Sequence, residues 1–112
     1  MPDSNSMPRI VLTTVASLDE GNKIARRLVE EHLAACVSLI PAIQSVYRWQ
    51  GSVESATEVL LLIKSGLEQL PALETRLHQL HGYETPEFLV LDVESGSHRY
   101  LEWLRASLEP GS

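Results

Sequence analysis

The segment CVSLIPAIQSVYRWQGSVESATEVLLLIK, residues 36–64, consists of two long runs rich in apolar residues, joined by a short polar link. The runs are Cys36–Tyr47 and Val53–Lys64, and the link is Trp49–Ser52. Glycine adopts positive φ without steric cost, so Gly51 suits a tight reversal, although Gln-Gly is a weaker turn signal than Asn-Gly. The segment predicts one long β-hairpin, and so short a link allows only antiparallel pairing.

Both faces of this predicted hairpin carry apolar side chains. Alternate residues of a strand point to opposite faces, which divides the apolar residues of the first strand into two sets. One set is Val37, Leu39, Ile43 and Tyr47, and the other is Ile40, Ala42 and Val46. The run Val59–Ile63 is apolar throughout, as is typical of a strand buried on both sides. Pro41 lacks a backbone donor and predicts an edge position, a bulge or a bend, with a kink that divides the strand as the preferred interpretation.

The residues before the hairpin predict a strand and a helix. Arg9–Val15 is dense in β-branched residues and predicts a central strand. Ser17 and Glu20 match a capping box at the start of a helix over Leu18–Leu33. The apolar stripe of this helix comprises Ile24, Ala25, Leu28, Val29 and Leu33.

The residues after the hairpin predict a helix, a strand and a closing helix. Leucines at positions 67, 70, 73, 77 and 80 follow helical spacing, and Gly82 is a natural stop. Pro71 requires either a preliminary turn over 67–70 or a helix that begins at Pro71, and both alternatives stay open. Glu87–Val93 predicts the fourth strand, and His98–Ser107 predicts the closing helix. The apolar side of that last helix comprises Tyr100, Leu101, Leu104 and Leu108.

The predicted order is β-α-β-β-α-β followed by a helix, which is the α+β, ferredoxin-like split βαβ arrangement. We expect a disordered N-terminal tail over residues 1–8, a single domain over residues 9–108 and a C-terminal tail over residues 109–112. Two helices cover one face of such a sheet, and the closing helix is too short to cover the other. Because apolar patches of that size are rarely left in water, the sequence predicts self-association.

Composition and charge exclude several classes of partner. The 112 residues include 9 Lys and Arg against 15 Asp and Glu, a formal net charge of -6 that is unsuited to tracking nucleic-acid phosphates. No apolar run approaches the roughly 20 residues of a membrane span, and the N-terminal residues lack the features of a signal peptide. The single Cys36 cannot form an intramolecular disulfide and is interpreted as a core residue. We expect a cytoplasmic protein with no nucleic-acid or membrane partner.

Several short motifs together resemble the CutA divalent-cation tolerance family, over residues 9–108. They are LAACV at 33–37, IP at 40–41, SVYRWQG at 45–51, Glu58 with LIK at 62–64, HGYETPE at 81–87 and YLEWL at 100–104. The resemblance implies a homotrimer of ferredoxin-like subunits, similar in assembly to the PII signalling proteins, with long hairpin strands that reach between subunits. It also implies a role in tolerance of divalent metals, copper in particular, and no established reaction.

Copper ligation in some members of that family uses a cysteine of the first strand and two adjacent histidines that end the second helix. The matching positions of this chain are Thr13, Leu80 and His81, and only His81 has a donor that copper prefers. Gly82 also replaces the proline that usually follows. The resemblance implies a divalent metal ion as cofactor, while these residues predict weak copper binding, or none, at that position.

A second candidate metal site combines His78, His81 and Glu84. Two histidines three residues apart on one helix share a face, and Glu84 follows in the next loop. The simpler interpretation is that the helix dipole favours histidines near a helix C-terminus.

Aromatic and charged residues of the hairpin are candidates for a ligand pocket or a subunit interface. Tyr47 and Trp49, near the tip, can stack on a planar ligand, but aromatic residues of self-associating β-proteins more often anchor interfaces. Glu58 and Lys64 share a strand face and can pair across a subunit cleft, as a structural ion pair or as part of a metabolite site.

The sequence contains no nucleophile elbow, no phosphate-binding glycine loop, no histidine–glutamate zinc motif and no set of cysteines. We therefore predict a trimeric protein of divalent-metal tolerance without enzymatic activity. The alternative is a PII-like trimer that senses a small ligand and has no metal role. Calorimetric titration with metals and metabolites distinguishes the two.

Overall fold

The computed structural model describes residues 7–111, which form a four-stranded sheet and three α-helices. The elements are β1 (Pro8–Val15), α1 (Leu18–Glu30), β2 (Cys36–Trp49), β3 (Ser52–Gly66), the 3-10 turn η1 (Leu67–Gln69), α2 (Leu70–Leu80), β4 (Leu89–Asp92) and α3 (His98–Leu108). The strand order is β2-β3-β1-β4, and every neighbouring pair is antiparallel. The predicted ferredoxin-like order, with its closing helix, is confirmed.

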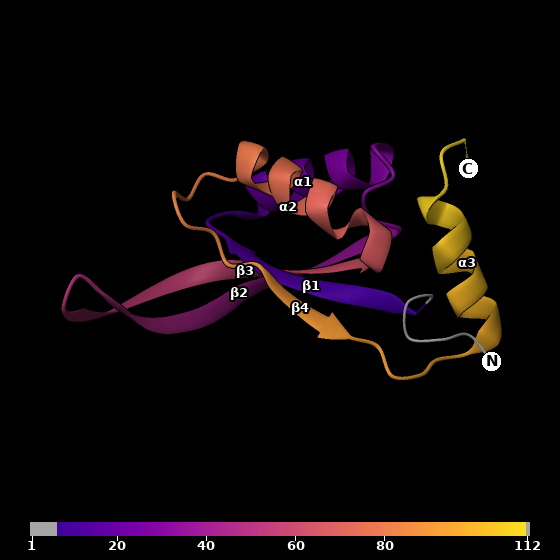
Figure 1. Ribbon diagram of the computed structural model, residues 1–112. Coiled ribbons are helices and arrows are strands. Elements are labelled where there is room, and N and C mark those ends of the chain that lie inside the picture. Colours follow the sequence, from indigo (N-terminus) through magenta and orange to yellow (C-terminus); the bar gives the residue numbers. More distant parts are fainter. Residues whose placement is uncertain (1–6, 112) are drawn as a thin grey trace.

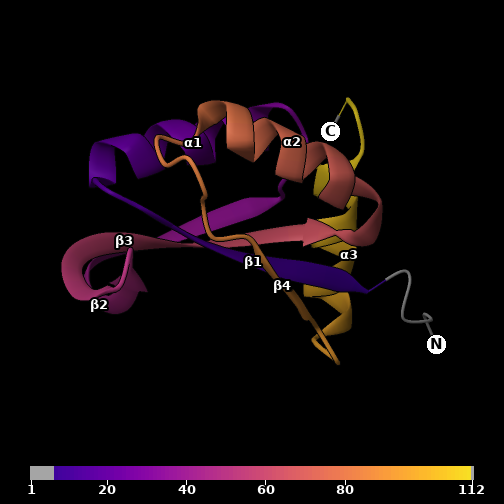
Figure 2. The same ribbon diagram turned by 60° about the vertical axis from the view of Figure 1, so that its left-hand side comes forward.

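Helices α1 and α2 lie together on one face of the sheet (Figure 1), and the turned view shows the same layering (Figure 2). α3 stands at one end of the sheet. The far half of the β2–β3 hairpin extends beyond both helices, so the longest dimension of the molecule is 48 Å. In neither view does a helix cover the middle of the opposite sheet face.

The predicted hairpin is confirmed, with Trp49 opposite Ser52 at its closed end. Gln50 and Gly51 have φ values of 49° and 83°. Positive φ at both central residues is the requirement of a two-residue type I′ turn, whose twist matches that of the paired strands. Gln-Gly therefore makes the same kind of turn as the more usual Asn-Gly.

Pro41 lies in a bulge of the edge strand β2. The register with β3 moves from Ile40–Leu60 to Ile43–Glu58, so β2 contains one extra residue. Ala42 takes a φ of 61° within this bulge. Both the edge position and the bulge remove the need for the backbone donor that proline lacks.

The main core lies between the helix-facing side of the central strands and the inner faces of α1 and α2. A Cβ on Gly21 of α1 would lie 3.0 Å from Leu39 Cδ2 and 3.2 Å from Val15 Cγ2, so glycine permits the close approach of helix and sheet. The buried members of this core are Val11, Val15, Ile24, Leu28, Ala34, Val59, Leu61, Ile63, Leu73 and Leu77. A smaller cluster of Ala35, Leu104 and Leu108 holds α3.

The starts of α1 and α2 follow from local chemistry. Ser17 Oγ accepts a hydrogen bond from Glu20 N at 3.1 Å, which is the serine half of the predicted capping box. For α2, the preliminary-turn alternative is the observed one: η1 comes first, and the helix begins at Leu70. Pro71 then lies in the first turn, where its missing N–H would be unpaired in any case.

Helix α1 ends at Glu30, three residues before the predicted Leu33. His32 adopts a φ of 59°, and the chain leaves the helix there. The amide of Leu33 bonds to Leu28 O at 2.9 Å, so Leu33 still packs on the core from outside the helix. Val29 was predicted to be buried but is 40% exposed. It lies beside β2, which is an outer strand, so the sheet does not extend far enough to cover the Val29 side chain.

The outer elements also differ from prediction. β4 is Leu89–Asp92 rather than Glu87–Val93, because only these residues pair with β1, opposite Arg9–Leu12. α3 ends one residue later than predicted. Its Tyr100, which was placed on the apolar side of the helix, is 43% exposed. Residues 1–6 of the predicted N-terminal tail lie outside the described residues. Pro8, the last residue of that predicted tail, is the first residue of β1.

Thr13 of β1 is fully buried, and its hydroxyl has no hydrogen-bond partner among residues 7–111. An unsatisfied buried hydroxyl costs roughly 1–3 kcal/mol. Thr13→Val keeps the side-chain shape and should therefore raise the free energy of unfolding by about 1 kcal/mol in urea titration. The control is Ser65→Ala, which should destabilise, because the equally buried Ser65 Oγ donates to Leu33 O at 2.7 Å. A Thr13→Val protein no more stable than its parent would contradict this account.

Candidate functional site

The loop between α2 and β4, residues 81–88, meets β3 at a buried carboxylate. Glu58 of β3 is 8% exposed, and Tyr83 Oη donates a hydrogen bond to Glu58 Oε2 at 2.7 Å. Gly82 N donates to Glu20 Oε2 of α1 at 2.8 Å. Glu20, the acidic member of the predicted capping box, thus holds the loop. These contacts bring the phenol of the loop and the carboxylates of two separate elements, α1 and β3, into one region.

The electrostatics of this region favour protonated side chains. Burial raises the pKa of the Tyr83 phenol, and the hydrogen bond to Glu58 and the charge of Glu58 raise it further. Loss of hydration also raises the pKa of Glu87, and the nearby Glu58 adds to that shift. Tyr83 is therefore a donor at neutral pH. The cluster offers carboxyl oxygens to a cationic group or to a group rich in hydrogen-bond donors.

His81 attaches the start of this loop to β1. It is 8% exposed and has an extended backbone after the last residue of α2, Leu80. His81 Nε2 lies 2.7 Å from Thr14 O, and His81 Nδ1 accepts from Tyr83 N at 3.0 Å. Both ring nitrogens are engaged by backbone groups.

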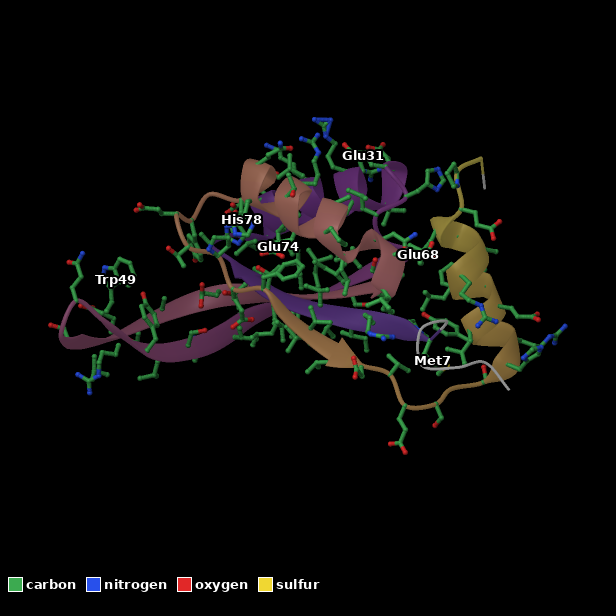
Figure 3. The ribbon with its side chains drawn as sticks, viewed as in Figure 1. Met7, Glu31, Trp49, Glu68, Glu74 and His78 are labelled. Carbon is green, nitrogen blue, oxygen red and sulfur yellow. The ribbon has the colours of Figure 1, made fainter. Side chains whose placement is uncertain are left out.

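The structure does not bring His78, His81 and Glu84 together. His78 is exposed on α2, with Nδ1 2.7 Å from Glu74 O one turn earlier (Figure 3). Because His81 lies past the end of the helix, the two histidines do not share the helix face that their spacing predicted. Glu84 is exposed in the loop. Within residues 7–111, no three His, Cys, Asp or Glu side chains are placed to hold one metal ion.

Tyr47 and Trp49 lie in the far half of the hairpin and are 45% and 54% exposed. Figure 3 shows Trp49 at the hairpin tip, well away from α1 and α2. This part of the hairpin is held in place by hydrogen bonds between β2 and β3. The exposed fraction of each ring is large enough for contact with another molecule. The structure of one chain therefore leaves these two residues available for either predicted role.

Lys64 lies at the opposite end of β3 from the hairpin tip. Its Nζ is 3.4 Å from Tyr100 Oη and 5.8 Å from the Tyr100 ring centroid. The Tyr100 and Trp103 rings lie 5.4 Å apart on α3. Glu58 and Lys64 are six residues apart on one strand, which corresponds to about 20 Å, so they do not pair within the chain. Pairing between copies stays a prediction.

The model of one protein family, described as CutA1 divalent ion tolerance protein, matches residues 9–107. The chain belongs to the CutA1 family. The resemblance inferred from its motifs is confirmed. The description of the family names tolerance of divalent ions and no reaction.

Two curated proteins and one solved structure illustrate what this CutA1 chain is similar to. The divalent-cation tolerance protein CutA of Thermus thermophilus is 46% identical over 99 residues, 88% of this chain and 96% of that protein. The chloroplastic protein CutA of Arabidopsis thaliana is 43% identical over 105 residues, 93% of this chain but only 58% of that protein. The crystal structure of CutA1 from Oryza sativa matches with a TM-score of 0.91 at 36% identity, over 97% of this chain and 100% of that chain.

Residue patterns alone assigned no functional-site role to Tyr83, Glu87 or Tyr100 of this CutA1 chain, although each contacts or influences a predicted site residue. The available signal was the family motifs, because the first two lie in HGYETPE and the third in YLEWL. Over residues 7–111, no helix is both long and apolar enough to cross a membrane.

Proposed function

We propose that this CutA1 chain acts in tolerance of divalent metal ions as a homotrimer, through binding or signalling and without a catalysed reaction. The observation that carries the proposal is the apolar sheet face that lies opposite α1 and α2. We also propose a cytoplasmic location, which the single Cys36 supports, because a lone cysteine forms no intramolecular disulfide.

All four strands contribute apolar side chains to the uncovered face. In the cross-strand register, Leu12 lies between Leu62 of β3 and Leu89 of β4. Leu89 and Leu91 are 55% and 47% exposed, and Ile40 on β2 is 43% exposed. The apolar members of this face are Ile10, Leu12, Ile40, Leu60, Leu62, Leu89 and Leu91. Each such side chain contributes roughly 1.5–3 kcal/mol when fully buried, so a few of them supply enough free energy to hold subunits together.

The two free edges of the sheet allow a head-to-tail ring of subunits. β2 and β4 are the two outer strands, and each presents one unpaired edge. Because the two edges differ, a contact between them is head-to-tail, and such contacts form a ring when the rotation between subunits closes. The number of three follows from the resemblance to trimeric CutA and PII proteins.

Sedimentation equilibrium tests the assembly directly. At micromolar concentration the protein should sediment at three times the chain mass of 12.5 kDa, with little monomer. Dimers or a folded monomer in that range would contradict the proposal.

Copper at the position used by some relatives does not fit the residues of this chain. Thr13 has no soft donor, Leu80 has no donor at all, and both nitrogens of His81 are engaged. His78 and Glu84 are exposed, and we propose each of them as a separate surface contact for a divalent ion, since no three-ligand site includes them within residues 7–111.

Copper titration by calorimetry, on protein purified without an affinity tag, should give binding weaker than micromolar at this position. The matched variants are His81→Ala and His78→Ala. Micromolar or tighter copper binding that His81→Ala abolishes would overturn the prediction. Binding abolished by His78→Ala and retained by His81→Ala would assign the metal to the surface of α2.

The second candidate function is PII-like sensing of a small ligand without a metal role. It is favoured by the two polar groups along β3, the Glu58–Tyr83 pair and the Lys64–Tyr100 pair. We propose that a neighbouring subunit adds further side chains to each pair. Calorimetric titration with metabolites as well as metals separates the two functions, because a sensor should bind a metabolite in metal-free buffer.

A further inference from the structure

Three consecutive residues fasten the loop after α2 to three different elements. His81 Nε2 contacts Thr14 O of β1 at 2.7 Å. Gly82 N donates to a carboxylate of α1, and Tyr83 Oη donates to Glu58 of β3. Because each residue has its own anchor, the loop has little freedom to shift one contact without the others.

The hydrogen bonds of His81 determine which ring nitrogen carries the proton. The carbonyl of Thr14 can only accept, so Nε2 is the protonated nitrogen. The amide of Tyr83 can only donate, so Nδ1 must be the unprotonated acceptor. His81 is therefore neutral in this arrangement, and a metal ion would have to displace one of these bonds to reach the buried ring.

His81 also packs on the ring of Tyr83. The two ring centroids lie 4.8 Å apart, with an angle of 46° between the planes. One side chain thus holds both the backbone amide and the phenol ring of Tyr83. The position of the phenol matters because the nine-tenths-buried carboxylate of Glu58 needs a donor, and the Tyr83 hydroxyl supplies one.

We propose that His81 is a positioning residue: it holds the amide and ring of Tyr83 so that the phenol meets Glu58, and both of its nitrogens are used in doing so. The histidine shared with the copper site of some relatives therefore has a different role in this chain. It builds the Tyr83–Glu58 contact rather than coordinating a metal. This role is independent of the number of subunits and of the function proposed above.

The first test needs no variant. Long-range ¹H–¹⁵N NMR of the imidazoles in the metal-free protein should show His81 in the neutral form with the proton on Nε2, and addition of one equivalent of Cu²⁺ or Zn²⁺ should leave that form unchanged. A proton on Nδ1, or loss of the signal on addition of either metal while other histidines are retained, would overturn the proposal.

The second test compares His81→Ala, His81→Asn and His81→Gln. The control is His78→Ala, which makes the same histidine-to-alanine change on the exposed side of α2. Asparagine can place an acceptor near the Nδ1 position, and glutamine can place a donor near the Nε2 position. Hydrogen exchange of the Tyr83 amide should be roughly tenfold faster in His81→Ala and His81→Gln, as expected for one lost hydrogen bond. His81→Asn should exchange more slowly than either, and His78→Ala should match the parent.

The ionisation of Tyr83 reports whether the phenol keeps its place. Tyrosinate absorbance identifies Tyr83 by comparison with Tyr83→Phe, and in the parent its pKa should lie above the ordinary value of about 10. In His81→Ala the pKa should fall toward that value, while His78→Ala should leave it unchanged. If His81→Ala does not fold, His81→Gln serves the same comparison. An unchanged Tyr83 pKa in a folded His81 variant would show that the phenol is placed without His81 and would overturn the proposal.

Discussion

Leu89→Glu should convert the proposed trimer to monomers at micromolar concentration while each chain stays folded. Leu89 is on β4, 55% exposed in the single chain, and lies opposite Leu12 on the sheet face without helix cover. In a subunit contact the new carboxylate would be buried without a partner, which costs on the order of 3–5 kcal/mol. That cost recurs in every subunit. Sedimentation equilibrium measures the loss of trimer, and circular dichroism reports whether the chain remains folded.

The matched control for this prediction is Leu18→Glu. Leu18 is 47% exposed, comparable to Leu89, but lies in the first turn of α1 on the helix layer. A carboxylate there faces water and the favourable end of the helix dipole, so assembly should be unchanged. Lowering the pH to about 4 should partly restore the Leu89→Glu trimer, because the new carboxyl then becomes protonated. If Leu89→Glu assembles as tightly as the parent at neutral pH, β4 does not lie in a subunit contact.

Leu61→Ala should destabilise the folded chain itself by about 2–5 kcal/mol, the range for removing a buried leucine side chain. Leu61 has no exposed surface and belongs to the central strand β3, where its Cδ1 lies within 3.4 Å of the Cβ position of Gly21. The cavity left by alanine cannot close easily, because the sheet and α1 are both rigid around it. Urea titration at a fixed protein concentration measures the effect.

The neighbouring Leu60 separates core packing from assembly. Its side chain points to the other face of β3, where it is only partly buried. Leu60→Ala should therefore act mainly through assembly, so its unfolding midpoint should depend on protein concentration more steeply than that of the parent. A Leu61→Ala cost below 1 kcal/mol, or equal effects of the two variants on assembly, would show that the two faces have been assigned the wrong way round.

Most of the fold was predictable from short-range patterns along the chain. The period-two and helical spacings, the Ser17 cap and the glycine of the hairpin turn each act within a few residues, so the sequence shows them directly. The family motifs added the trimer and the link to divalent metals, which remain proposals for this chain in their finer detail. The apolar run Val59–Ile63 predicted burial on both faces of β3. The helices bury one face, and cover of the other face by a second subunit stays a proposal.

The site and the element ends depended on contacts between distant parts of the chain. α1 ends where His32 turns out of the helix, and β4 ends where pairing with β1 stops. From the sequence, His81 is a candidate metal ligand on a helix. In the structure its buried side chain instead contacts the backbone oxygen of Thr14, 67 positions earlier. Local sequence determines which conformations a segment prefers, whereas the hydrogen-bond partners of a buried polar group depend on what the folded chain places beside it. For that reason the helices and strands were predictable from residue order, and the roles of His81, Tyr83 and Glu58 were decided only by the packing of the α2–β4 loop on the sheet.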